Sequence, residues 1–581
     1  MKGVPASLPS GPNAGPCETW VQVNDDAFGM DDPSEQSPPY DNEEGFEVIV
    51  FEGSLYVGME ADNAYGARLW RTRPGVILPQ DQSDWEEVAE ENGEPFGNPQ
   101  KQNDVYQNDH IDSLAVFKGI LFASTANGGS TRQGTMIYAS TTGASGSWKP
   151  VITAGFGYTE NTNFKDMQVF EDWLCGGTQN QSTGAQVWCT NDGISWMQKN
   201  HGGFGTADDD PTTIKVWSGY VYSGSLYFGA QNSGNTDDLG LLFRTDDIDV
   251  TSPTWTQVYT GVSGSGRVDI LGQLGDYFYI STAGPNGIRI LRSQTGKPGS
   301  WELVNEPGMD GDASNLGTVV DGATTYNGAL YVSVSNGKTV VEVWRTTGRI
   351  QDGGPRVDWA QVGASGLGDS NNYYAELIPY NGYLYAWTSN YETGQEVRRT
   401  ACPIQQAHAV TGAGTYEFSG AGATITLTAG ALDVLTVSVY PGGFPAAQTK
   451  HLPIARHYAI THTPVSGVFT ADLTLAYTAE ELAASDADTF TLYLTRWNGQ
   501  SWVACPSESR ERDADARTVT CRDVSDFSTW AFASVSGSPA PVYTFFLPIL
   551  TMAQTSLLTG LAVVVFTLLI TRFKIPEVQI E

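Results

Sequence analysis

A short strand containing tryptophan recurs along the chain, and its first copy stands alone. The isolated copy covers residues 18–23 around Trp20, with no other part of the repeat before it. Later copies surround Trp85, Trp148, Trp196, Trp255, Trp301 and Trp359, whereas a last repeat near residues 375–402 lacks this strand. Such repeats close into a ring when the first strand of the chain completes the last unit, so the pattern predicts a β-propeller.

Three further strands precede the tryptophan strand in each full repeat. The first two form a hairpin whose turn ends in Gly or Asp, as in Glu52-Gly53 and Asn381-Gly382. Such pairs supply the positive φ that tight hairpin turns need. Counting hairpins, third strands and tryptophan strands gives seven of each. We therefore expect an all-β, seven-bladed β-propeller over residues 1–402, with residues 17–23 completing the last blade.

Charge limits the class of partner. The 581 residues include 65 acidic and 31 basic side chains, a net charge of -34. A protein that binds a nucleic-acid backbone normally presents a basic face, so we expect no nucleic-acid partner. The charge favours an extracellular or high-salt surface.

The six cysteines fall into three plausible pairs. Cys17 precedes the isolated strand and Cys402 follows the third strand of the blade that needs it, so a disulfide could replace the missing connection. The other candidate pairs are Cys175 with Cys189, in neighbouring strands of one blade, and Cys505 with Cys521, beside a hairpin. Paired cysteines are typical of an oxidising compartment, and buried free thiols are the alternative.

The C-terminal part of the chain is organised differently. Alternating apolar residues predict a small β-sandwich over residues 403–535, followed by a linker at 536–554. The apolar run at 555–573 predicts a transmembrane helix, with residues 574–581 as a short basic cytoplasmic tail. We expect a single-pass cell-membrane protein with an extracellular ectodomain and the membrane as one partner. No apolar export signal opens this sequence.

Two segments carry family resemblances. Residues 190–196, with Thr190, Asp192, Gly193 and Trp196, resemble the Asp-box turn of sialidase-like propellers, and the whole repeat looks like bacterial secreted propellers. In those families the Asp-box fixes a turn away from the usual site, so the resemblance implies architecture rather than activity. About 60 residues of the second domain resemble a stalk-like module of bacterial surface proteins, which implies a spacer.

Catalytic sets known from propellers are harder to find. Sialidase chemistry needs three convergent arginines with a Tyr–Glu nucleophile pair and an Asp acid, but the arginines here recur at one register of the repeat and are more simply structural. The six histidines are scattered, with His110 and His201 in propeller loops, and we interpret them as surface residues. No metal ligand set is assigned.

The candidate binding surface is the set of loops that lead from each blade into the next. They share a small residue or Pro, an apolar residue, Gly, and then Asn or Asp. The candidate residues are Asp31, Asp32, Asn103, Asp104, Asn161, Asn163, Asp208, Asp209, Asp210, Asp369, Asn371 and Asn372. Their oxygens suit calcium, the one cofactor considered, or a glycan, although Asn, Asp and Gly are also ordinary turn residues.

Three functions fit this organisation. The first is an anchored recognition or adhesion protein that binds a glycan, polymer or protein through the propeller loops. The second is a glycoside hydrolase or lyase of sialidase-like propeller type, and the third is a structural envelope component. The sequence favours the first because no catalytic set rises above the repeat, so we expect binding rather than an enzyme.

Overall fold

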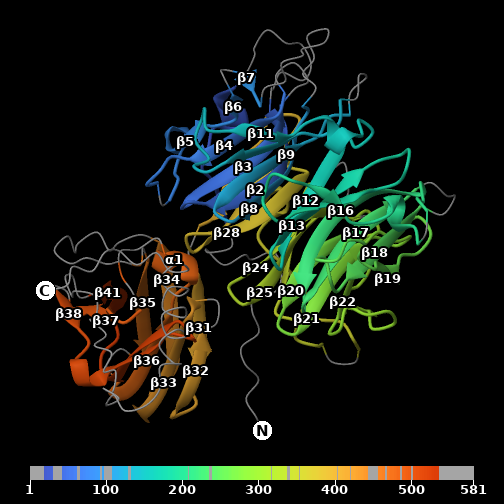
Figure 1. Ribbon diagram of the computed structural model, residues 1–581. Coiled ribbons are helices and arrows are strands. Elements are labelled where there is room, and N and C mark those ends of the chain that lie inside the picture. The colour runs from blue at the N-terminus through green and yellow to red at the C-terminus, as the bar shows by residue number, and fades with distance from the viewer. Residues whose placement is uncertain are drawn as a thin grey trace, which may run out of the picture. The chain divides into compact units, whose positions relative to one another are not determined.

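The computed structural model describes residues 19–534, with gaps at 31–41, 62–65, 77, 92–93, 97–107, 129–132, 207, 234–237, 310, 316, 336–339, 352–353, 402–403, 419–420, 442–453, 455, 465–466, 484–486, 488 and 499–500. The described part is all-β (Figure 1). Its one α-helix is the five-residue α1 (Ala479–Ala483). The predicted fold class is therefore confirmed at the level of an all-β chain.

The repeats form antiparallel units of four strands, in chain order from the inner to the outer strand. The first three are β2 (Asn42–Phe51), β3 (Ser54–Ala61), β4 (Arg68–Thr72) and β5 (Trp85–Glu87); β8 (Ile111–Phe117), β9 (Ile120–Thr125), β10 (Ile137–Ser140) and β11 (Lys149–Ile152); and β12 (Asn163–Phe170), β13 (Trp173–Gln179), β14 (Val187–Thr190) and β15 (Met197–Gln198). A small hairpin, β6 (Glu90–Glu91) and β7 (Glu94–Pro95), follows the first unit.

Four more units follow. They are β16 (Thr213–Tyr222), β17 (Ser225–Asn232), β18 (Leu239–Thr245) and β19 (Thr256–Thr260); β20 (Val268–Leu274), β21 (Tyr277–Thr282), β22 (Arg289–Ser293) and β23 (Glu302–Leu303); β24 (Gly317–Tyr326), β25 (Ala329–Ser335), β26 (Glu342–Thr346) and β27 (Ala360–Gln361); and β28 (Tyr374–Tyr380), β29 (Tyr383–Ser389), β30 (Val397–Thr400) and β1 (Trp20–Gln22). The pair Gln179↔Lys215 joins the third and fourth units into one sheet.

The first strands of consecutive units contact one another. These contacts run β2–β8, β8–β12, β12–β16, β16–β20, β20–β24, β24–β28 and β28–β2. The isolated strand pairs where the sequence predicts, since β1 lies antiparallel to β30 with Trp20 opposite Thr400 and Gln22 opposite Arg398. Four-stranded sheets arranged around their first strands make this part of the chain a β-propeller.

Turn chemistry explains the first hairpins. Glu52 and Gly53 have φ values of 49° and 77°, and Asn381 and Gly382 have 46° and 81°. Two central residues with positive φ form the type I′ turn, whose twist matches that of paired strands. The predicted hairpins are confirmed at these positions.

In three of the loops between units, the side chain that packs inward is a phenylalanine and not a polar residue. In η1 (Asp26–Gly29), Phe28 has a left-handed φ of 57° and stacks on Trp70 with ring centroids 4.5 Å apart. In η3 (Ala154–Gly157), Phe156 stacks on Trp188 at 4.7 Å, and Phe204 of η4 (Gly202–Phe204) stacks on Phe243 at 4.1 Å. The Gly-Phe-Gly segments are therefore packing elements of the fold.

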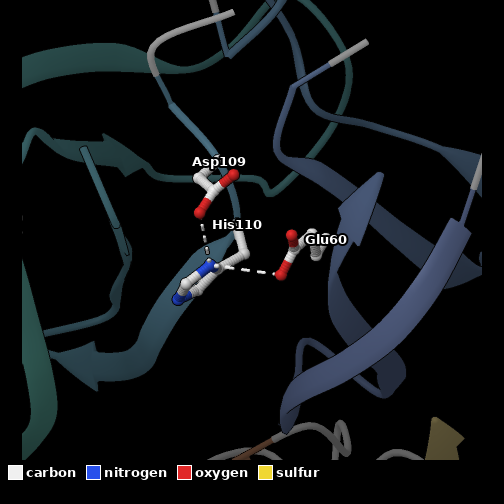
Figure 2. Close-up of side chains that lie close together, drawn as sticks. All are labelled: Glu60, Asp109 and His110. Atoms are coloured by element: carbon white, nitrogen blue, oxygen red, sulfur yellow. Dashed lines mark ion pairs between the residues drawn. The ribbon is translucent and has the colours of Figure 1, made fainter. Parts of the chain in front are cut away.

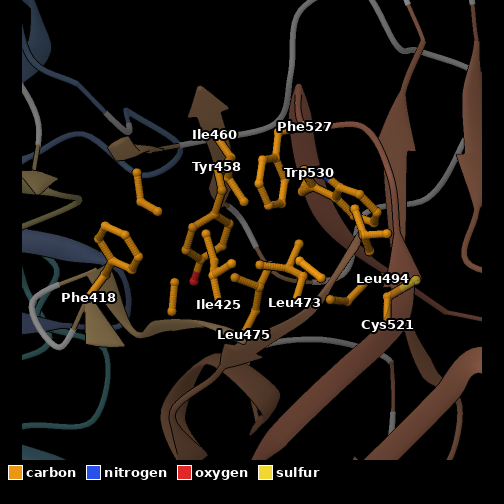
Figure 3. Close-up of a cluster of buried hydrophobic side chains, with 14 of the residues drawn as sticks. Phe418, Ile425, Tyr458, Ile460, Leu473, Leu475, Leu494, Cys521, Phe527 and Trp530 are labelled. Atoms are coloured by element: carbon orange, nitrogen blue, oxygen red, sulfur yellow. The ribbon is translucent and has the colours of Figure 1, made fainter. Parts of the chain in front are cut away.

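Residues 404–534 form two antiparallel sheets. One contains β31 (Gln405–Ala409), β34 (Val434–Pro441), β35 (Arg456–Thr463), β41 (Thr529–Ser534), β37 (Leu492–Trp497) and β38 (Trp502–Ala504), and the other β32 (Gly414–Phe418), β33 (Ala423–Gly430), β36 (Phe469–Ala476), β40 (Thr518–Val524) and β39 (Arg510–Asp513). Side chains of both sheets share one apolar core, including Ile425, Leu473, Tyr458 and Trp530 (Figure 3). Period-two alternation in strands such as β36 fills this core from one face.

Two of the three predicted disulfides are present. Cys175 and Cys189 face each other across β13 and β14, with Cα atoms 4.1 Å apart. Cys505 and Cys521 join with Cα atoms 5.9 Å apart. Cys17 and Cys402 lie outside the described residues.

The expected membrane localisation is corrected. The chain divides into two units, Met1–Ser534 and Val535–Glu581. The predicted linker at 536–554, span at 555–573 and tail at 574–581 lie outside the described residues. Among the described residues, no helix has the length and hydropathy to cross a bilayer. The predicted single-pass localisation is corrected on this finding, because a span needs about 20 apolar residues in one helix. The membrane as a partner stays a prediction.

Candidate functional site

The asparagines of the predicted loops hold those loops in shape. Asn161 is fully buried, and its Nδ2 donates to the Gly155 carbonyl at 3.0 Å. Asn372 repeats this contact with Gly366 at 3.0 Å. Their Oδ1 atoms accept from the amides of Asn180 and Asn390, at 2.8 Å and 3.1 Å. Buried amides with their donors and acceptors used within the loop are structural residues.

Most of the other loop candidates that the structure describes also bond within their own loops. Asp209 Oδ1 accepts from the Gly202 amide at 2.6 Å, and Asp210 Oδ1 accepts from the Thr212 amide at 3.0 Å. Similar local bonds involve Asn163 with Thr162, and Asp369 with Asn371, while Asp208 is exposed. Among the described residues, no hydrogen bond joins candidates of two different loops. Asp31, Asp32, Asn103 and Asp104 lie outside the described residues, so binding of calcium or a glycan at these loops stays a prediction.

The Asp192 turn has a clear local geometry. Its Oδ1 accepts from the backbone amides of Ser195 at 2.7 Å and Ile194 at 2.8 Å, and from the Thr190 hydroxyl at 3.0 Å. The two backbone hydrogen bonds lower the pKa of Asp192 to about 2. Gly193 supplies a φ of 77°, and Trp196 packs edge-on against Phe164. These residues fix a turn between β14 and β15.

A different group of residues gathers charge inside the propeller. We call it the inner cluster and define it as His110, Asp112, Lys165, Lys215, Trp217, Arg267 and Asp269. Its members come from β8, β12, β16 and β20, or from the residues just before them, and these are the first strands of consecutive, contacting units. Asp112, Lys165 and Lys215 are 0%, 5% and 8% exposed. Charges buried to this degree are rare without a role in folding or chemistry.

Asp112 is the anionic centre of the cluster. Its Oδ1 lies 2.7 Å from Lys165 Nζ and 3.2 Å from His110 Nε2, and its Oδ2 accepts from the Phe164 amide at 3.0 Å. Burial acts to raise the pKa of Asp112, but the charges of Lys165, His110 and Lys215 outweigh it and hold that pKa well below its usual range. Asp112 is therefore a fixed carboxylate and not a proton donor at neutral pH.

His110 lies among three carboxylates. Its Nδ1 is 3.4 Å from Asp109 Oδ2 and 3.6 Å from Glu60 Oε2 (Figure 2), while Nε2 faces Asp112. Burial acts to lower the pKa of His110, but the hydrogen bonds to Asp109 and Asp112 raise it to about 9. The interpretation of His110 as a surface residue was wrong, because its ring is enclosed by acidic groups from two units.

Three of these residues also have the types and spacing of metal ligands. Glu60, Asp109 and His110 place one ligand atom each within 4.8 Å of one another. A metal-bound imidazole must be neutral at the ligating nitrogen. With a pKa of about 9, His110 is an imidazolium at neutral pH, and both ring nitrogens point at carboxylates. In the described structure, Glu60 and Asp109 form ion pairs with His110.

Three cationic side chains of the inner cluster lie near the Trp217 ring. Lys215 Nζ lies 3.7 Å from the centroid of its ring, Arg267 Cζ 4.4 Å and Lys165 Nζ 5.6 Å. Its indole Nε1 donates to Gln231 Oε1 at 2.9 Å, which fixes the ring. Trp217 is half-buried and the Arg267 side chain is 31% exposed, so the cluster reaches solvent at these two residues.

Lys215 differs from its cationic neighbours. Lys165 is paired with Asp112 at 2.7 Å and Arg267 with Asp269 at 2.9 Å. Among the described residues, Lys215 Nζ has neither a hydrogen bond nor an ion pair, and it faces the Trp217 ring. Burial and the positive charges of Lys165 and Arg267, opposed by Asp112, lower the pKa of Lys215 to about 7. About half of this amine is neutral at pH 7.

Lys199 provides a comparison within the same molecule. It is also buried, and its Nζ lies 4.2 Å from the centroid of Trp173. However, that Nζ donates to the Val250 carbonyl at 2.9 Å, and Asp249 and Asp247 oppose the lowering of its pKa by burial. A buried lysine on an indole is thus satisfied at one site of this chain and unsatisfied at the other.

A sequence signal for the cluster exists. Asp112, Lys165, Lys215 and Asp269 each interrupt apolar residues at the start of the strand that precedes the first hairpin turn. Charge at such a position is unexpected in a strand buried on both faces. Which of these residues form hydrogen bonds and ion pairs with one another is determined only by the fold.

No protein-family model and no curated protein matches this chain. Among solved structures, the polysaccharide lyase Uly1 aligns with a TM-score of 0.37 and 11% identity, over 66% of this chain and 98% of that chain. The β-propeller domain of the Trilobed protease from Pyrococcus furiosus aligns with a TM-score of 0.35 and 7% identity, over 66% and 98%. An α-L-arabinofuranosidase from Clostridium thermocellum aligns with a TM-score of 0.27 and 13% identity, over 44% and 91%.

Proposed function

We propose that the chain is a carbohydrate-active β-propeller that binds an acidic polysaccharide at the inner cluster and cleaves it by elimination, as a lyase. The observation that carries this proposal is the half-buried Trp217 ring with three cations on it, in a protein of net charge -34. A surface of that charge repels an anionic polymer, so cations gathered at one aromatic ring mark where its carboxylate would bind.

Recognition follows from the chemistry of the two partners. Sugar rings pack on aromatic faces, and guanidinium and ammonium groups form charge-assisted hydrogen bonds with carboxylates. Arg267 is the most accessible cation of the cluster, and we assign it as the group that binds the sugar carboxylate. The expected substrate is therefore a polymer that contains uronate residues.

Elimination needs a base beside a neutralised carboxylate. Neutral Lys215 Nζ would take the proton from the carbon next to that carboxylate. The electron pair of the broken C–H bond forms a C=C bond, and the glycosidic oxygen leaves with its bonding pair and takes a proton from solvent. A base is most effective with a pKa near the working pH, which fits the pKa of about 7 at Lys215.

Hydrolysis by a carboxylate pair fits the cluster less well. That chemistry needs one carboxylic acid with a raised pKa to protonate the leaving group. Asp112 has a lowered pKa, and Asp269 is paired with Arg267 at 2.9 Å. The lyase is therefore preferred over the hydrolase, and over adhesion without chemistry.

The test is incubation with uronate-containing polysaccharides and with neutral ones, followed by ultraviolet absorbance of the conjugated C=C product. We expect product from the uronate polymers alone, at a rate that rises as the pH passes about 7, where Lys215 loses its proton. Lys215→Met should lose at least about a hundredfold in rate, the usual scale of general-base catalysis.

Lys118→Met is the matched control, because Lys118 is exposed and donates to the Asn191 carbonyl at 2.6 Å in a hairpin turn. Release of reducing ends without the C=C product would establish hydrolysis in place of elimination. Binding without any product would leave recognition as the function, and equal rates for Lys215→Met and wild type would overturn the assigned base.

We extend the proposal to the architecture that carries the site. The seven described four-stranded units would make a complete seven-bladed ring within residues 1–402, closed by β1 on β30, with a separate β-sandwich over residues 403–535. The inter-unit contacts and the register of Trp20 with Thr400 support this arrangement. The turn at Asp192 supports, at the level of local geometry, the resemblance to Asp-box propellers.

A further inference from the structure

We propose that Lys215 is a carbonyl-reactive amine that forms an imine with a small anionic aldehyde or keto acid, such as glyoxylate, whose carboxylate is held by the neighbouring cations. This goes beyond the proposed cleavage, in which Lys215 only moves a proton. It is also independent of that cleavage, because imine formation needs no polysaccharide.

The geometry leaves the amine unoccupied. Lys215 is 8% exposed and its Nζ lies over the Trp217 ring at 3.7 Å, with neither a hydrogen bond nor an ion pair among the described residues. Every other cation of the cluster faces a carboxylate at 3.2 Å or less. Lys215 is thus the cationic residue of the cluster that has no carboxylate partner among the described residues.

The electrostatics favour both reactivity and an anionic reactant. Lys165 faces Lys215 from β12, Arg267 from the residue before β20, and Asp112 from β8. The two cations disfavour an ammonium at Lys215, and desolvation or a cationic neighbour is a known way to activate a lysine nucleophile. The same cations would pair with a carboxylate that arrives beside the carbonyl.

The reaction balances without an oxidant or reductant. The neutral Nζ attacks the carbonyl carbon, and one N–H proton moves to the carbonyl oxygen to give a carbinolamine. The hydroxyl then leaves as water with the second N–H proton, and the C=N bond remains. Asp112 does not supply a proton, because its pKa lies well below its usual range.

Borohydride trapping on the full chain tests the proposal. Protein is incubated with glyoxylate at pH 7, reduced with borohydride, and mapped by peptide mass spectrometry for lysines that carry a carboxymethyl group. At pH 7, about half of the Lys215 side chain is neutral, whereas far below a hundredth of an ordinary lysine side chain is neutral. We therefore expect at least about tenfold more adduct at Lys215 than at Lys118. The adduct yield should rise with pH through about 7.

Lys199 is the matched internal control, since it is also a buried lysine on an indole but donates to Val250. Propanal, a neutral aldehyde, is the second arm. We expect weaker labelling of Lys215 by propanal, and an Arg267→Gln variant should lose the preference for glyoxylate. Equal adduct at Lys215, Lys199 and Lys118 would overturn the reactive amine, and equal labelling by the two aldehydes would overturn the anion recognition.

The mapping is done on the wild-type chain, so the result does not depend on whether a Lys215 variant folds. It is also separable from the proposed cleavage. Adduct at Lys215 without lyase product would support the imine and reject the lyase, and lyase product without adduct would do the reverse.

Discussion

Single residues show how this acidic chain stabilises charged side chains that are buried. Asp112 is fully buried, yet it is matched by Lys165, by His110 and by the Phe164 amide. Buried ions are tolerated when they are paired and hydrogen-bonded. Lys215 departs from that rule, and residues that break a local rule are where function is most often found.

His110 provides a test of this network at the residue scale. Its pKa is raised from 6.5 to about 9, so its contribution to stability is fully present below about pH 6.5 and is lost as the pH rises through about 9. His110→Asn should therefore lower the free energy of unfolding by on the order of 3 kcal/mol near pH 6 and by far less near pH 10.

Chemical denaturation of wild type and variant at the two pH values measures the difference. His201→Asn is the control, because His201 is exposed in the loop before β16. The difference between variant and wild type matters here, since Lys215 also titrates near pH 7. A pH-independent difference would contradict the assigned ion pairs.

Elements of neighbouring units are joined by repeated side-chain bonds to backbone. The indole nitrogens of Trp85, Trp255, Trp301 and Trp359 donate to carbonyls of the preceding unit's outer strand or its end, at 2.8 to 3.2 Å. The hydroxyls of Tyr222, Tyr326 and Tyr380 donate to the next unit's first hairpin turn, at 2.8 to 3.2 Å. The tryptophan that defines the repeat in the sequence thus ties one unit to the next.

At the element scale, Trp85→Phe tests how much the indole hydrogen bond between units contributes to stability. The ring is 1% exposed, and its Nε1 donates to the Val23 carbonyl at 2.8 Å. Removing the donor leaves a buried carbonyl unpaired, which costs about 1–3 kcal/mol in addition to the lost ring volume. Trp148→Phe is the control, because Trp148 is 2% exposed and its Nε1 has no partner among the described residues. Equal unfolding free energies for the two variants would contradict the role of the bond.

At the scale of the whole propeller, the two ends of the repeat array meet. Trp20, Val21 and Gln22 lie opposite Thr400, Arg399 and Arg398. The Tyr380 hydroxyl donates to the Gly53 carbonyl at 2.9 Å, which connects the last unit to the first. Without β1, β30 would be the edge strand of its sheet, so this pairing covers that edge.

Removal of residues 1–41 tests the closure. The shortened chain loses β1, the Val23 acceptor of Trp85 and the Phe28 ring stacked on Trp70. We expect a drop in the melting temperature on the order of 5 °C or more, measured by calorimetry. A chain without residues 535–581 is the control, and an equal drop in both would show that β1 does not stabilise the ring.

The sequence by itself determined the repeat, because tight turns, tryptophan strands and alternating apolar residues are local signals. From these signals it predicted the strands around Trp20 and Arg399, the tight hairpins and the C-terminal sheets, and from the cysteine positions it predicted the Cys175–Cys189 and Cys505–Cys521 disulfides. It could not show that Asn161 and Asn372, which have the residue types of ligands, form hydrogen bonds within the fold, and binding at the polar loops stays a prediction.

Only the tertiary structure decided which charges meet. Asp112, Lys165, Lys215 and Arg267 come from four repeats, and the local sequence does not show which of them lie together. Their distances, their desolvation and the resulting pKa values depend on the first strands lying side by side, which no residue spacing along the chain encodes. The pattern of a strand is set by its own residues, whereas the chemistry of the inner cluster is set by the contacts that bring the first strands of four units together.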